Sequence, residues 1–191
     1  MELQPLLCDT DAVLTEALPD LQMSSTLILD CEGVDLGRRG GSLSIITLRT
    51  ISPSSAQTYL IDVVRLSPSA LHPVFDLLRS SSVLKVVFDG RMDFSALYHG
   101  HGVELQNVLD LQLVDVASRN ESQEKHLERL GKCLKRGEIN GNKRMYVDVY
   151  KLSGLAECVR EHDVASSQGV SKGQGECLLL NSKCLSVLTF L

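Results

Sequence analysis

Apolar residues along the chain gather in short runs with the length of β-strands. Two continuous runs, Thr26–Cys31 and Val83–Phe88, are typical of strands that are covered on both faces. Leu43–Leu48 alternates between apolar and polar positions, and Thr58–Asp62 and Val103–Val108 are also rich in β-branched or large apolar residues. The pattern therefore predicts five strands.

Helix signals lie between and around these runs. Thr10 is placed to cap a short helix that should stop near Pro19, and Ser67 precedes a proline at the start of a second helix. Further helices are expected over 91–98 and 110–117. Three strands in succession, followed by alternation of strands and helices, favour an α/β fold with a mixed five-stranded sheet flanked by helices.

The length of 191 residues suits one ordinary domain. The periodic patterns end near residue 163, and Ala165–Gly175 is a run rich in Ser, Gly and Gln without periodicity. We therefore expect a domain over residues 10–163 and an atypical, poorly ordered tail over 164–191.

Composition narrows the classes of partner. A net charge of −5 argues against a protein that coats DNA by bulk electrostatics, although it leaves room for a nuclease whose metal ions face the phosphates.

The six cysteines form no C-x-x-C pair, and the chain opens without a signal peptide. The apolar tracts are too short to span a bilayer. These features predict an intracellular protein in the nucleus or cytoplasm, neither secreted nor bound in a membrane.

Two acidic residues stand at the end of the first buried strand. Asp30 and Glu32 are two positions apart, so that both side chains point to the same side of a strand. Two carboxylates held that close repel each other, and a divalent cation between them would remove the repulsion. The alternative is structural, with Asp30 capping a turn and Glu32 in water.

A second acidic pair, Asp89 and Asp93, follows the other long buried strand. A helix that begins near Asp89 would place Asp93 one turn in, on an exposed face. Capping by Asp89 and the helix dipole at Asp93 are the structural alternatives. Sites in α/β sheets gather at the carboxyl ends of strands, so the two pairs meet if their strands are neighbours. That arrangement suits two Mg²⁺ or Mn²⁺ ions acting on a phosphodiester.

The sequence around these acids resembles the DEDD superfamily of 3'-5' exonucleases. Leu29–Gly41, which reads LDCEGVDLGRRGG, is similar to the first exonuclease motif, and Lys85–Asp93 with Asn107–Gln112 is similar to the second motif and its sequel. Among DEDD proteins the chain most resembles the RNase D-like branch with Egalitarian-type exonuclease domains. The resemblance implies a ribonuclease H-like fold, two divalent metal ions and removal of nucleotides from the 3' end of RNA or DNA.

By position, the resemblance makes Asp30, Glu32 and Asp93 the catalytic residues and metal ligands. It makes Asp89 a residue that supports the metal ligands without binding the metal itself. Arg91 lies near Asp93, and Arg38 and Arg39 could contact a substrate phosphate, although solvated loop arginines are the simpler interpretation.

A third motif, with a Tyr or His shortly before an Asp on a late helix, is expected in this superfamily and is not found. Residues 165–191 contain no Asp. The C-terminal part of the fold is therefore expected to be incomplete, and activity to be impaired. The leading hypothesis is a metal-dependent 3'-5' exonuclease domain. The alternatives are an inactive exonuclease-like module that binds nucleic acid or acts as a scaffold, and a chain that does not fold stably.

Overall fold

The structure is a computed structural model that describes residues 4–51, 56–121 and 126–162. The expected tail over 164–191 lies outside the described residues. The chain divides into two compact units, with the boundary between Val114 and Asp115, inside the helix α4 (Leu111–Glu121). Each unit is described by itself. No helix in the described ranges is both long enough and apolar enough to cross a membrane.

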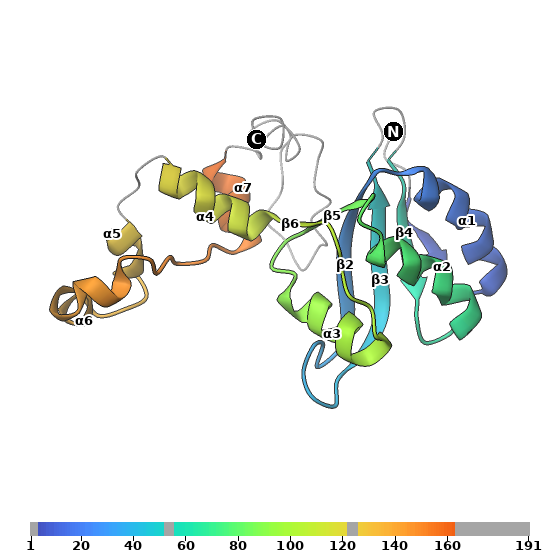
Figure 1. Cartoon of the computed structure of the whole chain (residues 1–191), viewed down its shortest axis with the longest axis horizontal. Coiled ribbons are helices and arrows are strands. Elements are labelled where there is room, and N and C mark those ends of the chain that lie inside the picture. The colour runs from blue at the N-terminus through green and yellow to red at the C-terminus, as the bar shows by residue number, and fades with distance from the viewer. Residues whose placement is uncertain (1–3, 52–55, 122–125, 163–191) are drawn as a thin grey trace. The chain divides into compact units, whose positions relative to one another are not determined.

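The first unit is built on a six-stranded sheet with the order β1-β4-β3-β2-β5-β6 (Figure 1). The strands are β1 (Leu6–Cys8), β2 (Thr26–Val34), β3 (Ser42–Thr50), β4 (Thr58–Asp62), β5 (Leu84–Val87) and β6 (Val108–Asp110). Strand β3 is antiparallel to both β2 and β4, whereas the other three pairs are parallel. The expected α/β fold with a mixed sheet and flanking helices is confirmed.

Two details of the sheet differ from the expectation. A sixth strand, β1, extends the sheet beside β4. The strand expected over 103–108 is wrong, because β6 begins only at Val108. Val103 is fully buried in the core outside any strand, so its apolar character serves packing. The pattern of residue types alone does not separate these two uses.

Three helices accompany the sheet in the first unit. They are α1 (Asp11–Met23), α2 (Pro68–Arg79) and α3 (Arg91–His101). Thr10 caps α1 as expected, because its hydroxyl accepts a hydrogen bond from the backbone of Val13. The helix does not stop near Pro19, however, and continues to Met23. Leu21 is fully buried on the same face as Leu14, so packing outweighs the hydrogen bond that the proline removes.

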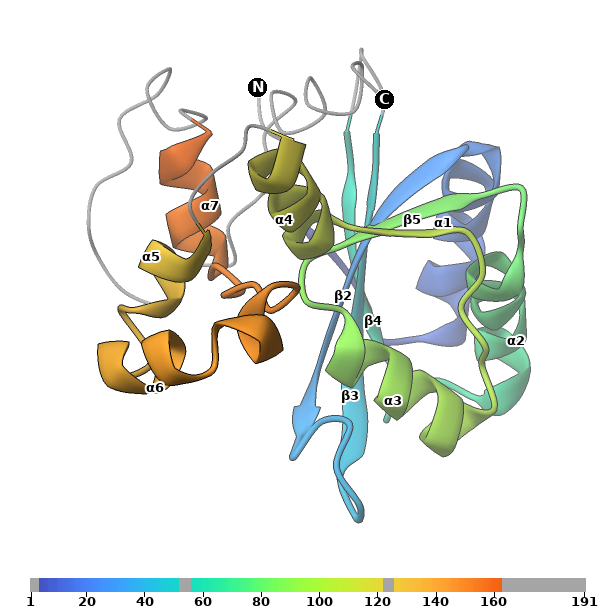
Figure 2. The same ribbon diagram turned by 60° about the vertical axis from the view of Figure 1, so that its left-hand side comes forward.

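The helices pack in two groups on the sheet. Helices α1 and α2 contact each other, while α3 contacts β2 and β3. Figures 1 and 2 show α3 beside β2 and β3, at the end of these strands where a loop connects them. One apolar core joins the strands to all three helices.

The loop between β2 and β3, residues 35–41, approaches α3 closely. The hydroxyl of Ser95 donates a hydrogen bond to the carbonyl oxygen of Gly37 over 2.7 Å. Gly37 has a φ of 69°, and a Cβ atom there would lie 2.7 Å from the carbonyl oxygen of Met92. Only glycine suits both the backbone angle and the contact. Gly37 therefore allows the close approach of the loop to the helix.

The second unit contains short helices joined by charged contacts. They are α5 (His126–Leu130), α6 (Arg136–Gly141), a 3₁₀ helix (Lys143–Tyr146) and α7 (Leu155–Glu161), with the last turns of α4. Arg129 binds both carboxylate oxygens of Glu161, at 3.0 and 3.1 Å from its Nη1 atom. Asp115 is 2% exposed and accepts hydrogen bonds from Arg119 and His162. These pairs join α4 and α5 to α7.

Candidate active site

The two strands that end in acidic residues are neighbours, which is the condition for the two acidic pairs to meet. Strands β2 and β5 run parallel, with Thr26 opposite Leu84 and Ile28 opposite Val86. Strand β5 ends at Val87, while β2 continues through Asp30 to Val34. The acidic part of β2 therefore lies beyond the end of β5, where the chain turns into α3. This edge of the sheet is the carboxyl end of both strands, where ligands bind in open α/β sheets.

Asp30 and Glu32 lie within β2 and share one side of the strand. Cys31 between them is 4% exposed and belongs to the apolar core. Asp30 is half-buried and Glu32 is exposed. The pairing with β3 shifts its register between Glu32 and Gly33, which marks a bulge directly after the second acid. Bulges of this kind redirect side chains at sheet edges and next to active sites.

Asp93 lies in the first turn of α3 and is only 6% exposed. A helix that begins near Asp89 would place Asp93 on an exposed face. Helix α3 begins at Arg91, the first residue of the expected range 91–98, with Gly90 as the capping residue and Asp89 in the left-handed conformation at φ 56°. Each residue turns a helix by about 100°, so a start two residues later points Asp93 in a different direction.

Asp110, at the end of β6, holds this turn in place. Its carboxylate accepts hydrogen bonds from the backbone amides of Asp89 at 3.0 Å and Gly90 at 3.1 Å. It also accepts one from the amide of Gln112 at 2.9 Å, at the start of α4. The strained turn before Asp93 is therefore supported from the neighbouring strand. The sequence predicted only the helix-capping part of this role.

Asp89 itself is paired with Arg91. The Nη2 atom of Arg91 lies 3.0 Å from one carboxylate oxygen of Asp89, and its Nε atom binds the other. Arg91 is largely exposed, while Asp89 is half-buried. The pair lies at the start of α3, two residues before Asp93.

The acids of β2 and α3 affect one another electrostatically. Burial raises the pKa of Asp93 to about 7, and the negative charge of Asp30 adds to the rise. Glu32 and Asp89 act in the same direction with smaller effects, while the backbone amide of Cys31 opposes the rise. Burial also raises the pKa of Asp30, followed by the charge of Glu32. The structure therefore brings Asp30, Glu32 and Asp93 within electrostatic reach of one another.

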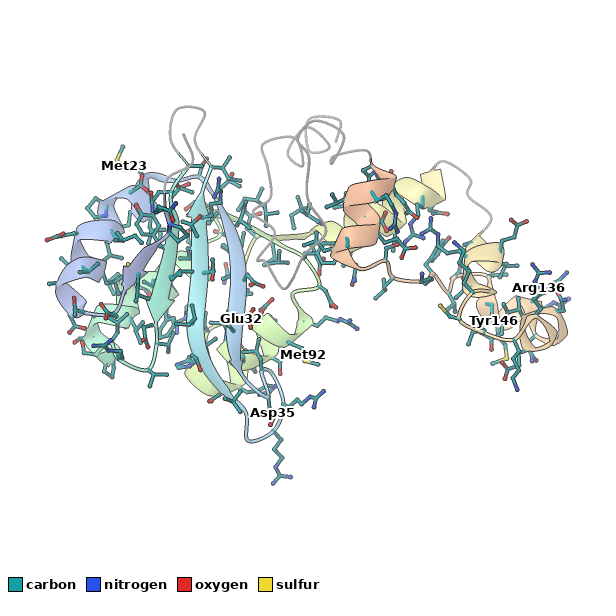
Figure 3. The ribbon with its side chains drawn as sticks, turned by 180° about the vertical axis from the view of Figure 1, so that it is seen from behind. Met23, Glu32, Asp35, Met92, Arg136 and Tyr146 are labelled. Carbon is teal, nitrogen blue, oxygen red and sulfur yellow. The ribbon has the colours of Figure 1, made fainter. Side chains whose placement is uncertain are left out.

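The chemistry of these side chains suits a divalent cation, since all the donors are hard oxygens that repel one another. Among the described residues, however, no group of three or more His, Cys, Asp or Glu side chains is arranged to hold a metal ion. Figure 3 shows Glu32 on β2 near Met92 of α3. Asp30 raises the pKa of Asp93 more than the exposed Glu32 does.

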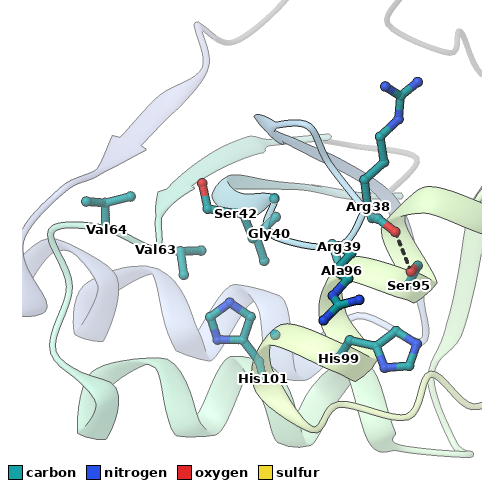
Figure 4. Close-up of a pocket in the computed structure, with 14 residues that line it drawn as sticks. Arg38, Arg39, Gly40, Ser42, Val63, Val64, Ser95, Ala96, His99 and His101 are labelled. Atoms are coloured by element: carbon teal, nitrogen blue, oxygen red, sulfur yellow. Dashed lines mark hydrogen bonds between the residues drawn. The ribbon is translucent and has the colours of Figure 1, made fainter.

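Arg38 and Arg39 lie in the loop between β2 and β3, which lines a pocket together with α3. The pocket also contains His99 and His101, from the last turn of α3 (Figure 4). The residue pattern assigned no role to the two histidines, because the pocket joins segments about 60 positions apart. The signal in the sequence that could have indicated this pocket is the spacing of the two histidines, two positions apart after an acidic motif.

Comparisons with known proteins agree with this fold. The exonuclease domain of EXD2 is 24% identical, with a TM-score of 0.51, over 62% of this chain and 61% of that one. RNase D of Trypanosoma brucei is 32% identical, with a TM-score of 0.49, over 56% of this chain and 37% of that one. The Nibbler exonuclease domain of Aedes aegypti is 22% identical, with a TM-score of 0.49, over 60% and 58%. No curated protein sequence matched the chain.

The fold is therefore that of an exonuclease-type α/β domain of the ribonuclease H-like kind. A family model described as 3'-5' exonuclease matches residues 6–181, which is most of the sequence. The chain belongs to this 3'-5' exonuclease family. It spans about a third of the length of the Trypanosoma brucei RNase D structures that it matches, at 32–37% of those chains. Exonuclease domains of this family normally use divalent metal ions.

Proposed function

We propose that the chain is a metal-dependent 3'-5' exonuclease domain that removes nucleotides from the 3' end of RNA or DNA. Asp30, Glu32 and Asp93 would hold Mg²⁺ or Mn²⁺. The metal ions would supply an activated water and stabilise the leaving oxygen of the phosphodiester. The DEDD-type assignment within the family, with an RNase D-like and Egalitarian-type relationship, belongs to the same proposal. So does a domain over residues 10–163 with a distinct tail.

The observation that carries the proposal is the electrostatic isolation of Asp93. It is a buried carboxyl whose charged neighbours among the described residues are other acids, and its pKa is raised to about 7. Burying a carboxylate among like charges costs stability unless it is protonated, and above pH 7 a bound cation would offset this cost. Perturbed acids of this kind are common at catalytic sites. Membership of the exonuclease family gives the reaction.

The neighbouring residues would keep these ligands in place. Asp110 fixes the turn before α3 through three backbone amides. Asp89 and Arg91 form an ion pair at the same turn. We propose that Asp89 and Arg91 do not bind the metal ions themselves. They support the ligands by setting the direction of the first turn of α3.

A second function deserves a test, because one observation favours it. Three described acids come together without forming a ready cluster for a metal ion. A domain that kept the fold and lost turnover would bind nucleic acid as a module or scaffold. It would then show no saturable binding of Mg²⁺ or Mn²⁺ at Asp30 and Asp93.

The proposal is tested with the purified chain, Mn²⁺ and single-stranded RNA or DNA labelled at its 5' end. We expect a ladder of products shortened one nucleotide at a time from the 3' end. Asp30→Asn should reduce the rate by roughly a hundredfold or more, because it removes a central ligand. Asp76→Asn is the matched control, since it makes the same change on the exposed side of α2 and should keep the wild-type rate.

Two results would contradict the proposal. Shortening that continues unchanged in Asp30→Asn would show that the assigned site is not responsible. A strand that is bound but never shortened, in either metal ion, would favour the nucleic-acid-binding module. A strand blocked at the 3' end should stay intact in the same reaction, which distinguishes exonuclease from endonuclease cleavage.

A further inference from the structure

A pocket of about 730 Å³ lies beside the acidic site in the first unit. Pockets that bind small molecules commonly measure roughly 300–1,000 Å³. One wall is Gly37–Leu43, from the loop and the first residues of β3, and another is the second half of α3; Val63 and Val64 also line the pocket. The first turn of the same helix carries Asp93. His99 is six residues further along α3, about 9 Å by the rise of an α-helix, so the pocket and the acidic site lie along the same helix.

The side chains that line this pocket are basic. Arg38 and Arg39 carry a positive charge, His99 can carry one, and the lining residues include no Asp or Glu. Burial lowers the pKa of His101, so that its ring contributes a neutral N–H donor to the pocket. In a chain of net charge −5, a basic group beside an acidic site needs an explanation. Anionic groups of a ligand are the natural complement of such a pocket.

The two arginines of the loop differ in direction. In Figure 4 the side chain of Arg39 turns toward α3 and the pocket, whereas Arg38 points away from it. Arg38 also lies 3.8 Å from the carboxylate of Asp35, in an exposed ion pair. Among the described residues, Arg39 has no ion pair with an acid of the protein. Arg39 is therefore the arginine that is available to a ligand in the pocket.

Two contacts hold the opposite walls in position. The ring of His101 packs on Phe75 of α2, with centroids 5.3 Å apart, and is half-buried. The hydrogen bond from Ser95 to Gly37 joins the loop to α3 at the rim of the pocket. The basic groups therefore belong to a site with defined walls. A planar guanidinium in such a site suits a phosphate, whose oxygens accept several of its hydrogen bonds.

We infer that this pocket binds a backbone phosphate of the nucleic-acid strand, next to the nucleotide held at the acidic site, through Arg39, His99 and His101. The inference rests on the proposed function for the identity of the ligand. It adds a second point of attachment for the strand that does not depend on metal ions. Contacts to phosphate position a strand without reading its sequence, so the pocket should serve RNA or DNA of any sequence.

The inference is tested by fluorescence anisotropy with a short single-stranded oligouridylate labelled at its 5' end. The buffer contains EDTA, so that neither turnover nor metal ions contribute. Arg39→Gln should weaken binding roughly ten- to hundredfold, the cost of losing a hydrogen-bonded charge. It should also lower the slope of log affinity against log salt by about one. Arg38→Gln, the matched control in the same loop, should change affinity by less than about threefold.

Nuclear magnetic resonance provides a second measurement in the wild-type protein. Adding the oligouridylate should shift the ring signals of His99 and His101, which His99→Gln and His101→Gln identify. The ring signals of His72, an exposed residue of α2, should not move. Ring signals of His99 and His101 that stay in place at saturating strand would overturn the inference, even if Arg39→Gln weakened binding by disturbing the loop.

Three further outcomes would overturn the inference. The first is no strand binding in EDTA, and the second is an equal loss in Arg38→Gln and Arg39→Gln. The third is competition by uridine monophosphate or inorganic phosphate at concentrations near the Kd of the strand, which would make this a site for a free phosphate. Failure of the proposed function looks different, because the strand is then not shortened in Mn²⁺ while binding that depends on Arg39 persists.

Discussion

The two units each bury an aspartate, and they treat it in opposite ways. Asp93 in the first unit is 6% exposed, and Asp115 in the second is 2% exposed. Burial and the charge of Asp30 raise the pKa of Asp93 to about 7. Burial also acts to raise the pKa of Asp115, but hydrogen bonds from Arg119 and His162 outweigh it and lower that pKa.

The difference separates an acid that supports the fold from an acid that weakens it. Asp115 has an arginine at 2.8 Å on the same helix and is compensated within the protein. Asp93 has acids as neighbours, and within the described ranges it forms no ion pair with a basic side chain. A buried acid that the protein leaves without a counter-charge is best explained by a ligand that brings one. The second unit shows what the chain does when the acid has a structural role.

The largest expected effect is in the second unit. Asp115→Ala removes the carboxylate that accepts two hydrogen bonds from the buried guanidinium of Arg119, so we expect it to destabilise this unit by about 3–5 kcal/mol at pH 7. Hydrogen exchange read by mass spectrometry should show lost protection over 115–121 and 126–161. Protection in the strands of the first unit should remain.

The low pKa of Asp115 also gives this effect a pH dependence. A carboxyl with a lowered pKa stabilises the fold above its ordinary pKa of 3.8, and the contribution disappears as the pH falls through the folded value. The destabilisation by Asp115→Ala should therefore shrink toward low pH. Equal protection of the wild type and Asp115→Ala at pH 7 would show that the Asp115–Arg119 pair has no structural role.

A smaller effect of the opposite sign is expected in the first unit. The folded pKa of Asp93 is about 7 against an ordinary 3.8, so the metal-free fold loses stability as the pH rises from about 4 to 7. Asp93→Asn removes that cost. We expect the variant to be more stable than the wild type by roughly 2–4 kcal/mol at pH 8 in EDTA, at about 1.4 kcal/mol per pKa unit, and by little at pH 4.

Urea unfolding at the two pH values, followed by circular dichroism, measures this difference. Asp76→Asn is the control for a change of charge, because Asp76 is exposed on α2. A variant Asp93→Asn that is less stable than the wild type at pH 8 would show that Asp93 is a structural residue. The comparison with Asp115 would then lose its meaning.

Much of the fold was predictable from the residue pattern. The strands β2, β3, β4 and β5 were expected close to their positions, because burial on both faces or one face leaves a clear signature. Strand β1 was missed because it has three residues and two of them, Leu6 and Leu7, are largely exposed. The position of Pro19 suggested an early helix end that packing of Leu21 overrides.

The candidate site was predictable in part. The acids were found because carboxylates at the ends of buried strands form a local pattern. The burial of Asp93 could not be predicted, because it depends on the left-handed backbone of Asp89 and on the support of that turn by Asp110. Asp110 lies about 20 positions away in the sequence. The basic pocket was missed for the same reason: its walls come from distant segments. Sequence patterns identify single acids well, and contacts between segments poorly.

The most direct test of the account is calorimetric titration of Mn²⁺ into the wild-type chain, Asp93→Asn and Asp76→Asn at pH 8. We predict saturable binding to the wild type and to Asp76→Asn, and binding weaker by at least about tenfold in Asp93→Asn. An absence of saturable heat in the wild type, or equal affinity in Asp93→Asn, would contradict the claim that this buried aspartate is kept for a metal ion.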